Sequence, residues 1–187
     1  MIRSTGSRKN RTFTGDPSDV QYSCAFISLY PKRGEIYSAG TTGVASYAKN
    51  TALRMGGHVL VLADYDLKPE HYSEENTSVY RCFKPNTFSM WFNIYNHLRL
   101  FPKIKDIFIQ FDTAMYGNMF VSGLIIPFLA LLKYKGYHVN VVNHHVIADV
   151  SRLKGHIGLT NRLSDTYRAH IYNGLFHIFY RLLGLTA

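Results

Sequence analysis

Apolar runs along the chain alternate with segments in which apolar residues recur every three or four positions. A short apolar run bounded by turn residues is typical of a strand buried in a parallel sheet, whereas the longer spacing is typical of a helix with one buried face. The expected strands are 24–29, 58–63, 78–83, 106–111 and 137–143. The expected helices are 43–55, 88–100, 117–135 and 163–183.

This alternation predicts an α/β domain, because parallel strands are joined by right-handed helical crossovers. We expect a single Rossmann-like three-layer sandwich with a mostly parallel sheet over residues 22–187. Residues 1–21 lack periodic apolar positions and read as a flexible basic tail. Ligands of such sheets bind beyond the carboxyl ends of the strands, so the polar segments that follow the strands should meet at one edge.

Composition agrees with one domain that has a substantial core, since 47% of the residues are hydrophobic and 18% are charged. Cys24 and Cys82 lie within apolar runs, which predicts buried, reduced thiols and excludes a disulfide scaffold. The apolar segment 119–132 is shorter than the roughly 20 residues that cross a bilayer, so it reads as a buried helix. No apolar segment follows the basic N-terminus, which argues against a secretory signal and predicts a cytoplasmic location.

The formal charge of +9 is concentrated at the two ends of the chain. Residues 1–11 hold four basic residues and no acid, and residues 148–187 hold five basic residues against two acids, which leaves +2 for the middle. A balanced body with basic ends fits a tail and a surface patch better than a groove for nucleic acid, which is therefore not an expected partner. The tail, Arg152, Lys154 and the helix 163–183 instead predict a peripheral contact with an anionic membrane surface.

A glycine-bearing loop, Gly40-Thr41-Thr42-Gly43, leads directly into the first helix. Free amide groups and the dipole at a helix N-terminus favour an anion such as a phosphate. The alternative is a tight turn in which Thr42 caps the helix. Ser38 stands where the dinucleotide fingerprint has its first glycine, and no Walker lysine follows the loop, which argues against a nucleoside triphosphatase.

Two later strands also end in chemically active residues. His144 and His145 close the last predicted strand, and adjacent side chains on an extended segment point to opposite sides, so one histidine should reach the rim and the other should be buried. No Cys or Glu stands at ligand spacing, so no metal site is expected. Asp112 and Tyr116 precede another helix, where they suit recognition of polyols. Helix capping is the alternative for Asp112.

The order of these segments resembles the N-terminal domain of glycosyltransferases of the GT-B fold, family four. The resemblance rests on the glycine loop and helix 40–50, the Gly-His strand within 55–63, the strand 106–112 with Met-Tyr-Gly at 115–117, and Val-Val-Asn-His-His at 141–145. Each motif is degenerate, but together they cover about residues 22–185 in the family's order.

The resemblance implies a role for each candidate residue. Gly40, Thr41, Thr42 and Gly43 would lie against the diphosphate of a nucleotide sugar, and His145 would be the catalytic residue that contacts the transferred sugar. The acceptor, a glycan or a lipid-linked sugar, would bind along the rim made by Tyr37, Asp112, Tyr116 and His144.

The resemblance also implies a retaining hexosyl transfer that needs no cofactor besides the nucleotide-sugar donor. A complete GT-B enzyme has two domains, and the second domain carries most of the donor site, including a Glu-x7-Glu pair that this sequence lacks. We therefore expect the chain to be the N-terminal, acceptor-side half, with a C-terminal donor-binding domain as its partner and little activity alone.

Two other functions remain open at this point. A dinucleotide-binding oxidoreductase of the NAD type would use Asp64, which lies roughly 20 residues beyond the glycine turn, to bind the ribose hydroxyls. A non-catalytic module would dock another subunit through the apolar helix 163–183.

Overall fold

The computed structural model describes residues 20–35, 42–112, 115–147, 149–150 and 163–187. The predicted tail therefore lies almost entirely outside the described residues. Each predicted strand and helix is present within a few residues of its expected bounds. The strands are β1 (Tyr22–Ser28), β2 (His58–Asp64), β3 (Glu70–Glu74), β4 (Thr77–Phe83), β5 (Asp106–Phe111) and β6 (His138–Asn143). The helices are α1 (Gly43–Arg54), α2 (Met90–Leu98), α3 (Met119–Gly123), α4 (Ile125–Tyr134) and α5 (Leu163–Thr186).

Strand β3 is an addition to the predicted elements. It pairs with β4 in antiparallel register, with Tyr72 opposite Val79, and forms one edge of the sheet. Tyr72 is its single buried residue, so no apolar run marks the strand in the sequence. An edge strand needs only one protected face, and its composition can therefore remain polar.

The predicted helix 117–135 is divided into α3 and α4, which meet at Leu124. Pro127 lies in the first turn of α4, where a missing amide leaves no hydrogen bond unmade. In a continuous helix, the residue at position 127 would donate its amide hydrogen to the carbonyl of Gly123, and proline has no such hydrogen. The division thus removes the conflict that proline would create in a helix interior.

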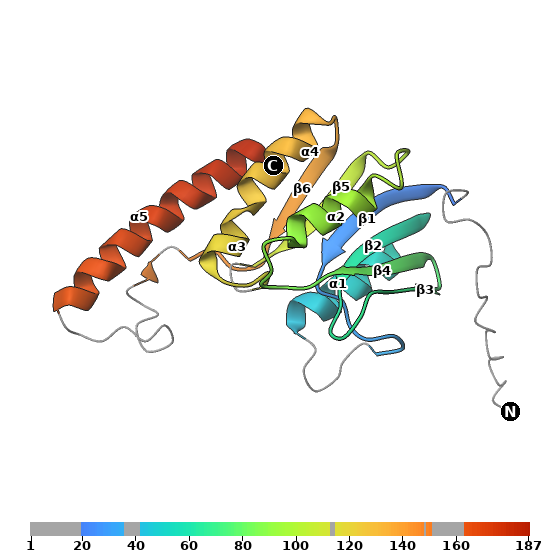
Figure 1. The fold of residues 1–187 in the computed structure, drawn as a ribbon, viewed down its shortest axis with the longest axis horizontal. Helices are drawn as coiled ribbons and strands as arrows, with labels where there is room; N and C mark the ends of the chain where they lie inside the picture. Colours follow the sequence, from blue (N-terminus) through green and yellow to red (C-terminus); the bar gives the residue numbers. More distant parts are fainter. Residues whose placement is uncertain (1–19, 36–41, 113–114, 148, 151–162) are drawn as a thin grey trace, which may run out of the picture.

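The sheet has the order β3-β4-β2-β1-β5-β6, and every pairing except β3 with β4 is parallel. From β1 the chain passes through α1 to β2, and β3 and β4 extend the sheet in the same direction. It then returns through α2 to β5, which pairs with the opposite edge of β1 (Figure 1). This is a Rossmann-like doubly wound arrangement, in which the winding direction changes between β1 and β5.

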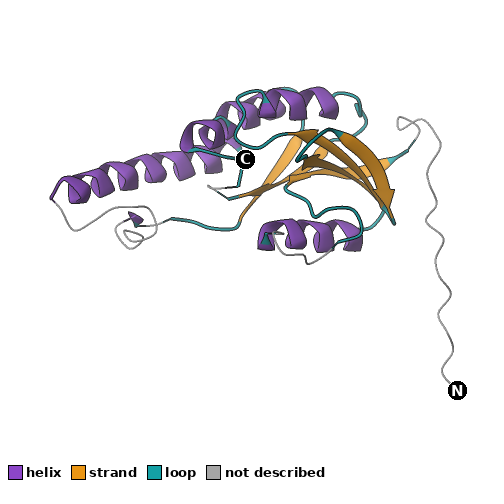
Figure 2. Cartoon of the chain, turned by 60° about the horizontal axis from the view of Figure 1, so that its bottom comes forward, coloured by secondary structure: helices purple, strands orange, loops and turns teal. Residues whose placement is uncertain are grey.

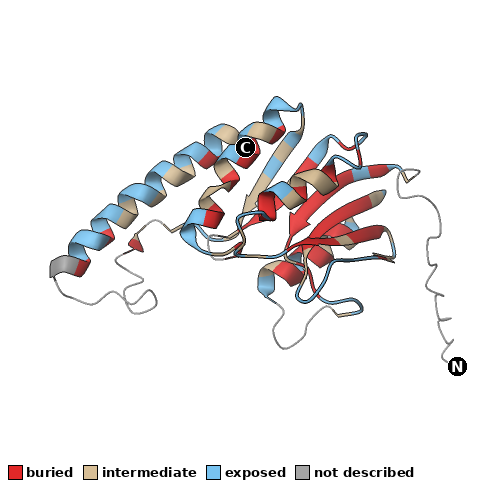
Figure 3. Ribbon diagram, viewed as in Figure 1, coloured by how far each residue is buried: buried red, intermediate tan, exposed pale blue. Residues whose placement is uncertain are grey.

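The sheet is a middle layer between helices. Helix α1 lies below it, α2 and α4 lie above it, and the long helix α5 extends to the left beyond the sheet (Figure 2). Ala25, Ile27 and Leu60 face the larger apolar core, and Phe26 and Val61 face the smaller core under α1. The central strands are consequently buried on both faces (Figure 3). Cys24 and Cys82 are buried free thiols, as predicted.

Two loops at the carboxyl edge are held together by a close backbone approach. A Cβ on Gly117 would lie 2.6 Å from the Cα of Asn86, and Gly117 has a φ of 131°, so no other residue fits there without strain. The Asn86 amide donates to the Tyr116 carbonyl at 2.7 Å, and the Asn118 amide donates to the Asn86 side chain at 3.0 Å. These contacts fix residues 116–118, which lead into α3.

None of the helices that the structure describes combines the length and the apolar character needed to cross a bilayer.

Candidate functional site

Helix α1 begins beyond the carboxyl end of β1 with a capped N-terminus. The Oγ1 atom of Thr42 accepts a hydrogen bond from the Ala45 amide at 3.2 Å, which confirms the capping role considered for this residue. Gly43 is exposed, and a Cβ placed there would meet no atom within 4 Å. Because Thr42 takes up the Ala45 amide, the amides of Gly43 and Val44, together with the positive end of the helix dipole, are the groups of the first turn that can bind an anion.

Several of the predicted site residues lie outside the described part of the chain. These are Tyr37, Gly40 and Thr41, together with Arg152 and Lys154. Of the predicted diphosphate loop, the structure places only Thr42 and Gly43.

His145 forms a hydrogen bond with Asp112 across the ends of β6 and β5. Its Nδ1 atom lies 2.5 Å from Oδ2 of Asp112, and the side chains are 74% and 17% exposed, respectively. The hydrogen bond to Nδ1 fixes the orientation of the ring and leaves Nε2 for a ligand. A histidine held by a carboxylate in this way can accept a proton or a hydrogen bond from a substrate hydroxyl.

His144 points to different partners, as expected for neighbouring residues on an extended segment. Its Nε2 atom lies 2.7 Å from Oε1 of Gln110, and its ring meets the ring of Tyr47 edge-on, with 5.2 Å between the centroids. Burial lowers the pKa of His144, Asp112 opposes this effect, and His145 adds to it. Since Tyr47 belongs to α1, this contact links the end of β6 to the helix that starts at Thr42.

Tyr116 does not lie on the rim where the acceptor role was expected. Its side chain is fully buried, and its hydroxyl donates to the carbonyls of Gln110 at 2.8 Å and Ile27 at 3.2 Å. The expectation of rim exposure is wrong, because Tyr116 packs against Trp91 and Phe111 in the larger core. Its hydroxyl satisfies backbone groups at the strand ends and is not free for an acceptor.

The candidate residues that are described therefore gather around the point where the winding of the sheet changes. Helix α1 starts after β1, and Asp112 follows β5, which is the neighbour of β1 in the sheet. Ligands of doubly wound sheets bind at such a switch point. The Tyr47–His144 contact extends this region to the end of β6.

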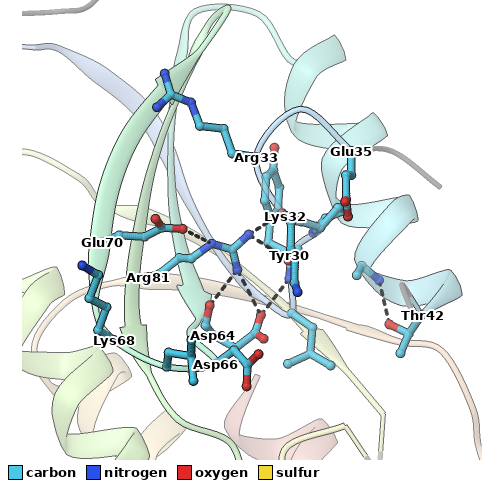
Figure 4. Close-up of a pocket in the computed structure, with 14 residues that line it drawn as sticks. Tyr30, Lys32, Arg33, Glu35, Thr42, Asp64, Asp66, Lys68, Glu70 and Arg81 are labelled. Carbon is cyan, nitrogen blue, oxygen red and sulfur yellow. Dashed lines mark hydrogen bonds and ion pairs between the residues drawn. The ribbon is translucent and has the colours of Figure 1, made fainter. Parts of the chain in front are cut away.

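A cavity of about 760 Å³ opens on the other side of the N-terminus of α1, between the ends of β1 and β2 (Figure 4). Thr42 and Ala45 border it. Four basic and four acidic residues line it, so their formal charges cancel: Lys32, Arg33, Lys68 and Arg81 against Glu35, Asp64, Asp66 and Glu70. A balanced lining of donors and acceptors suits a neutral, hydroxyl-rich group better than an anion.

Arg81 forms the wall of this cavity and is buried. Its guanidinium donates to the carbonyls of Asp64 at 2.7 Å and Tyr30 at 3.2 Å, and also to the carbonyl of Pro31. It further contacts the Tyr72 hydroxyl at 3.1 Å and pairs with Glu70 at 3.1 Å. Burial raises the pKa of Tyr72 to about 12, even though Arg81 acts in the opposite direction. All these contacts stay within the protein, so Arg81 organises the strand ends.

Asp64, the residue that would bind ribose in an oxidoreductase, stands at the end of β2 as that function requires. However, its Oδ1 atom already accepts the Tyr30 amide at 2.9 Å, and Arg81 lies 3.9 Å from the same oxygen. Burial raises the pKa of Asp64, while the Tyr30 amide and Arg81 reduce the shift. This carboxylate is mainly occupied in holding the chain after β1.

Sequence reasoning missed Arg81, Lys49 and Tyr47. Arg81 lies in a strand and Lys49 in a helix, where a charged residue usually marks a solvated position, and only the fold shows both to be buried. Tyr47 is an apolar residue at helical spacing within the predicted helix 43–55, but its side chain is 49% exposed and its ring contacts that of His144. The Lys-Arg pair at 32–33, four residues beyond the first strand, was an available signal for the cavity.

In the described part of the chain, no three His, Cys, Asp or Glu side chains form a group that could hold a metal ion. Comparisons with protein-family models, with curated proteins and with solved structures find no match to this chain.

Proposed function

We propose that this chain is the acceptor-side domain of a retaining glycosyltransferase that uses a nucleotide sugar. The observation that carries the proposal is the contact of Tyr47 with His144. Tyr47 belongs to α1 and His144 precedes His145, so the contact links the N-terminal part of α1 to the oriented His145–Asp112 pair at the switch point. One feature suits a diphosphate and the other suits a sugar hydroxyl. The sequence resemblance supplies the reaction that joins them.

In the proposed reaction, a hydroxyl oxygen of the acceptor forms a bond to the anomeric carbon of the donor sugar. The bond from that carbon to the phosphate oxygen breaks, and the nucleoside diphosphate leaves with the electron pair and takes up the hydroxyl proton. The amides of Gly43 and Val44, in the first turn of α1, stabilise the negative charge on the leaving diphosphate. Nε2 of His145 accepts a hydrogen bond from a hydroxyl of the transferred sugar and fixes its position.

The acceptor is assigned to the polar surface around Asp112 and His144. The cavity beside Thr42 offers a second polar surface next to the same helix N-terminus, and its balanced charges favour the hydroxyl-rich part of an acceptor. In this proposal, a second domain binds the nucleotide and completes the site, so the chain alone binds ligands weakly and transfers little.

The test is a heteronuclear NMR titration of the full chain with UDP-glucose, GDP-mannose and NAD in turn. We expect a nucleotide sugar to shift the amide signals of Gly43 and Val44 and the ring signals of His145. No response at the N-terminus of α1 to either nucleotide sugar would overturn the diphosphate assignment. Saturable shifts centred on Asp64 with NAD would replace it with dinucleotide binding.

A matched control exists at the opposite end of the same two strands. His138 and Asp106 form a similar pair, with Nδ1 and Oδ1 3.2 Å apart, where β6 and β5 begin. The variant His145→Gln should weaken the response to the nucleotide sugar several-fold, whereas His138→Gln should leave it unchanged. Equal losses in both variants would show that the effect is not specific to the site.

A further inference from the structure

Helix α5 is attached to the domain by one face only. Phe179 packs against Phe111, with 5.6 Å between the ring centroids, and Leu183 is buried against the larger core. Asn173 accepts the Val150 amide at 2.6 Å, and the Tyr180 hydroxyl accepts the Ile147 amide at 3.1 Å. These contacts lie between Asn173 and Leu183 on one side of the helix, so its rotation about its own axis is fixed.

The opposite face of α5 carries an exposed apolar stripe. Its members share a spacing of three or four residues, which places them on one side of the helix. They are Tyr167, Ile171, Leu175, Ile178, Leu182 and Leu185, each between 42% and 70% exposed. At 1.5 Å per residue, the stripe is about 27 Å long. Exposed residues mark α5 along almost its whole length (Figure 3).

Basic residues border this stripe on both sides. At about 100° per residue, the six stripe positions cover about 80° of the helix circumference, with Arg168 next to one border and Arg181, His170 and His177 beyond the other. The single acid of α5, Asp165, is 8% exposed and lies 3.6 Å from Arg168. The exposed surface of the described part of α5 therefore presents basic and apolar groups without an acid.

We propose that the α5 stripe docks the domain on an anionic lipid bilayer, with the helix lying in the plane of the interface. An apolar face with basic borders is the pattern of an interfacial helix, and bilayers with anionic headgroups attract such borders. The described part of α5 exposes no acid, so its charge has one sign: anionic headgroups complement it, whereas a second copy of the chain would repel it.

Docking would also place the candidate site close to the lipid. The Tyr180 hydroxyl, on the inner face of α5, lies 3.3 Å from the carbonyl oxygen of His145. If the domain acts as proposed above, this link favours an acceptor with a lipid anchor over a free glycan. This consequence rests on the proposed function, whereas the docking itself does not.

The test is flotation of the full chain with vesicles of equal parts phosphatidylglycerol and phosphatidylcholine at low salt. We expect binding that is lost with pure phosphatidylcholine vesicles. The variant Ile171→Ser/Leu175→Ser should bind at least about tenfold more weakly, because both substitutions fall within the α5 stripe that would enter the bilayer. The matched control Leu67→Ser/Leu100→Ser removes two exposed leucines elsewhere and should bind normally. Arg181→Gln should lose about fivefold, with Lys103→Gln as its control.

A second measurement follows the stripe directly. Cys24 and Cys82 are buried, so a polarity-sensitive dye attached to the folded variant Leu175→Cys reports position 175. We expect a blue shift on anionic vesicles and none for a dye on Leu67→Cys. Equal binding of the Ile171→Ser/Leu175→Ser variant, equal losses in both double variants, or an unshifted dye would overturn the proposal. Self-association that the same substitutions abolish, without vesicle binding, would assign the stripe to a second copy of the chain.

Discussion

The two halves of the carboxyl edge use their charged groups in different ways. Around Arg81, a buried guanidinium donates to three backbone carbonyls and one hydroxyl, and it pairs with Glu70. Around His145, one carboxylate holds a ring that is 74% exposed. Titratable residues at strand ends are therefore not evidence of a site by themselves. Burial and the use of their hydrogen bonds separate residues that hold the fold from residues that remain available to a ligand.

The largest expected effect is on the Arg81 side. The variant Arg81→Met leaves three carbonyls and Glu70 without their donor, and breaking a buried charged network costs about 3 to 5 kcal/mol of unfolding free energy. Urea unfolding followed by circular dichroism measures this loss. Arg99→Met, which removes an exposed arginine at the end of α2, is the control and should change stability by at most about 0.5 kcal/mol. A loss below about 1 kcal/mol for Arg81→Met would contradict the structural role.

The next effect concerns a buried ion pair between α1 and β3. Lys49 lies 2.7 Å from Glu74, with side chains 4% and 14% exposed, and also donates to the Glu35 carbonyl. We expect Lys49→Met to cost about 3 kcal/mol, because it leaves a largely buried carboxylate unpaired. The double variant Lys49→Met/Glu74→Gln should cost less than the sum of the single variants in a double-mutant cycle. Arg54→Met in the same helix is the exposed control, and strictly additive losses would argue against coupling.

A smaller loss is expected for Tyr116→Phe, which keeps the ring and removes the buried hydroxyl. Two carbonyls at the strand ends then lose a donor, at a cost of about 1 to 2 kcal/mol. Tyr134→Phe removes a hydroxyl from a residue that is 83% exposed and should be neutral in the same unfolding measurement. Unchanged stability of Tyr116→Phe would remove the reason for excluding this residue from the site.

On the His145 side, we expect almost no effect on folding. His145→Ala should change the unfolding free energy by at most about 0.5 kcal/mol, because the ring is mostly exposed. His138→Ala, in the similar pair at the other end of the strands, should behave alike. A substantial loss for His145→Ala alone would place His145 with Arg81 among the residues that maintain the fold.

The smallest effect is a pH dependence from His144. Burial lowers its pKa in the folded state, so the unfolded chain binds more protons once the pH falls below the usual histidine pKa of about 6.5. Stability should therefore decrease as the pH falls from about 6.5 toward the lower pKa of the folded state. Unfolding of His144→Asn across this range should show a weaker decrease than the original chain. Identical pH profiles would contradict the assignment.

Part of the candidate site could be predicted because it depends on position along a strand. Asp64 ends β2, Asp112 directly follows β5 and His145 lies two residues beyond β6, and parallel strands bring their carboxyl ends to one edge. Tyr116 and Arg81 could not be placed in the same way. Whether each side chain points into the core or toward the rim depends on neighbours from distant segments, such as Trp91 for Tyr116 and Tyr30 for Arg81.

The sequence by itself determined the α/β class, the position of nearly every helix and strand, and the edge at which polar residues gather, because apolar periodicity and turn residues act over a few neighbouring positions. Only the tertiary structure decided that β3 completes the sheet as an antiparallel edge and that the apolar face predicted for α5 is mostly exposed. Phe179 and Leu183 contact the body of the domain. Their packing fixes the orientation of the helix about its axis, so Ile171 and Leu175 face outward. Periodicity defines a face, but only packing against distant segments decides what covers it.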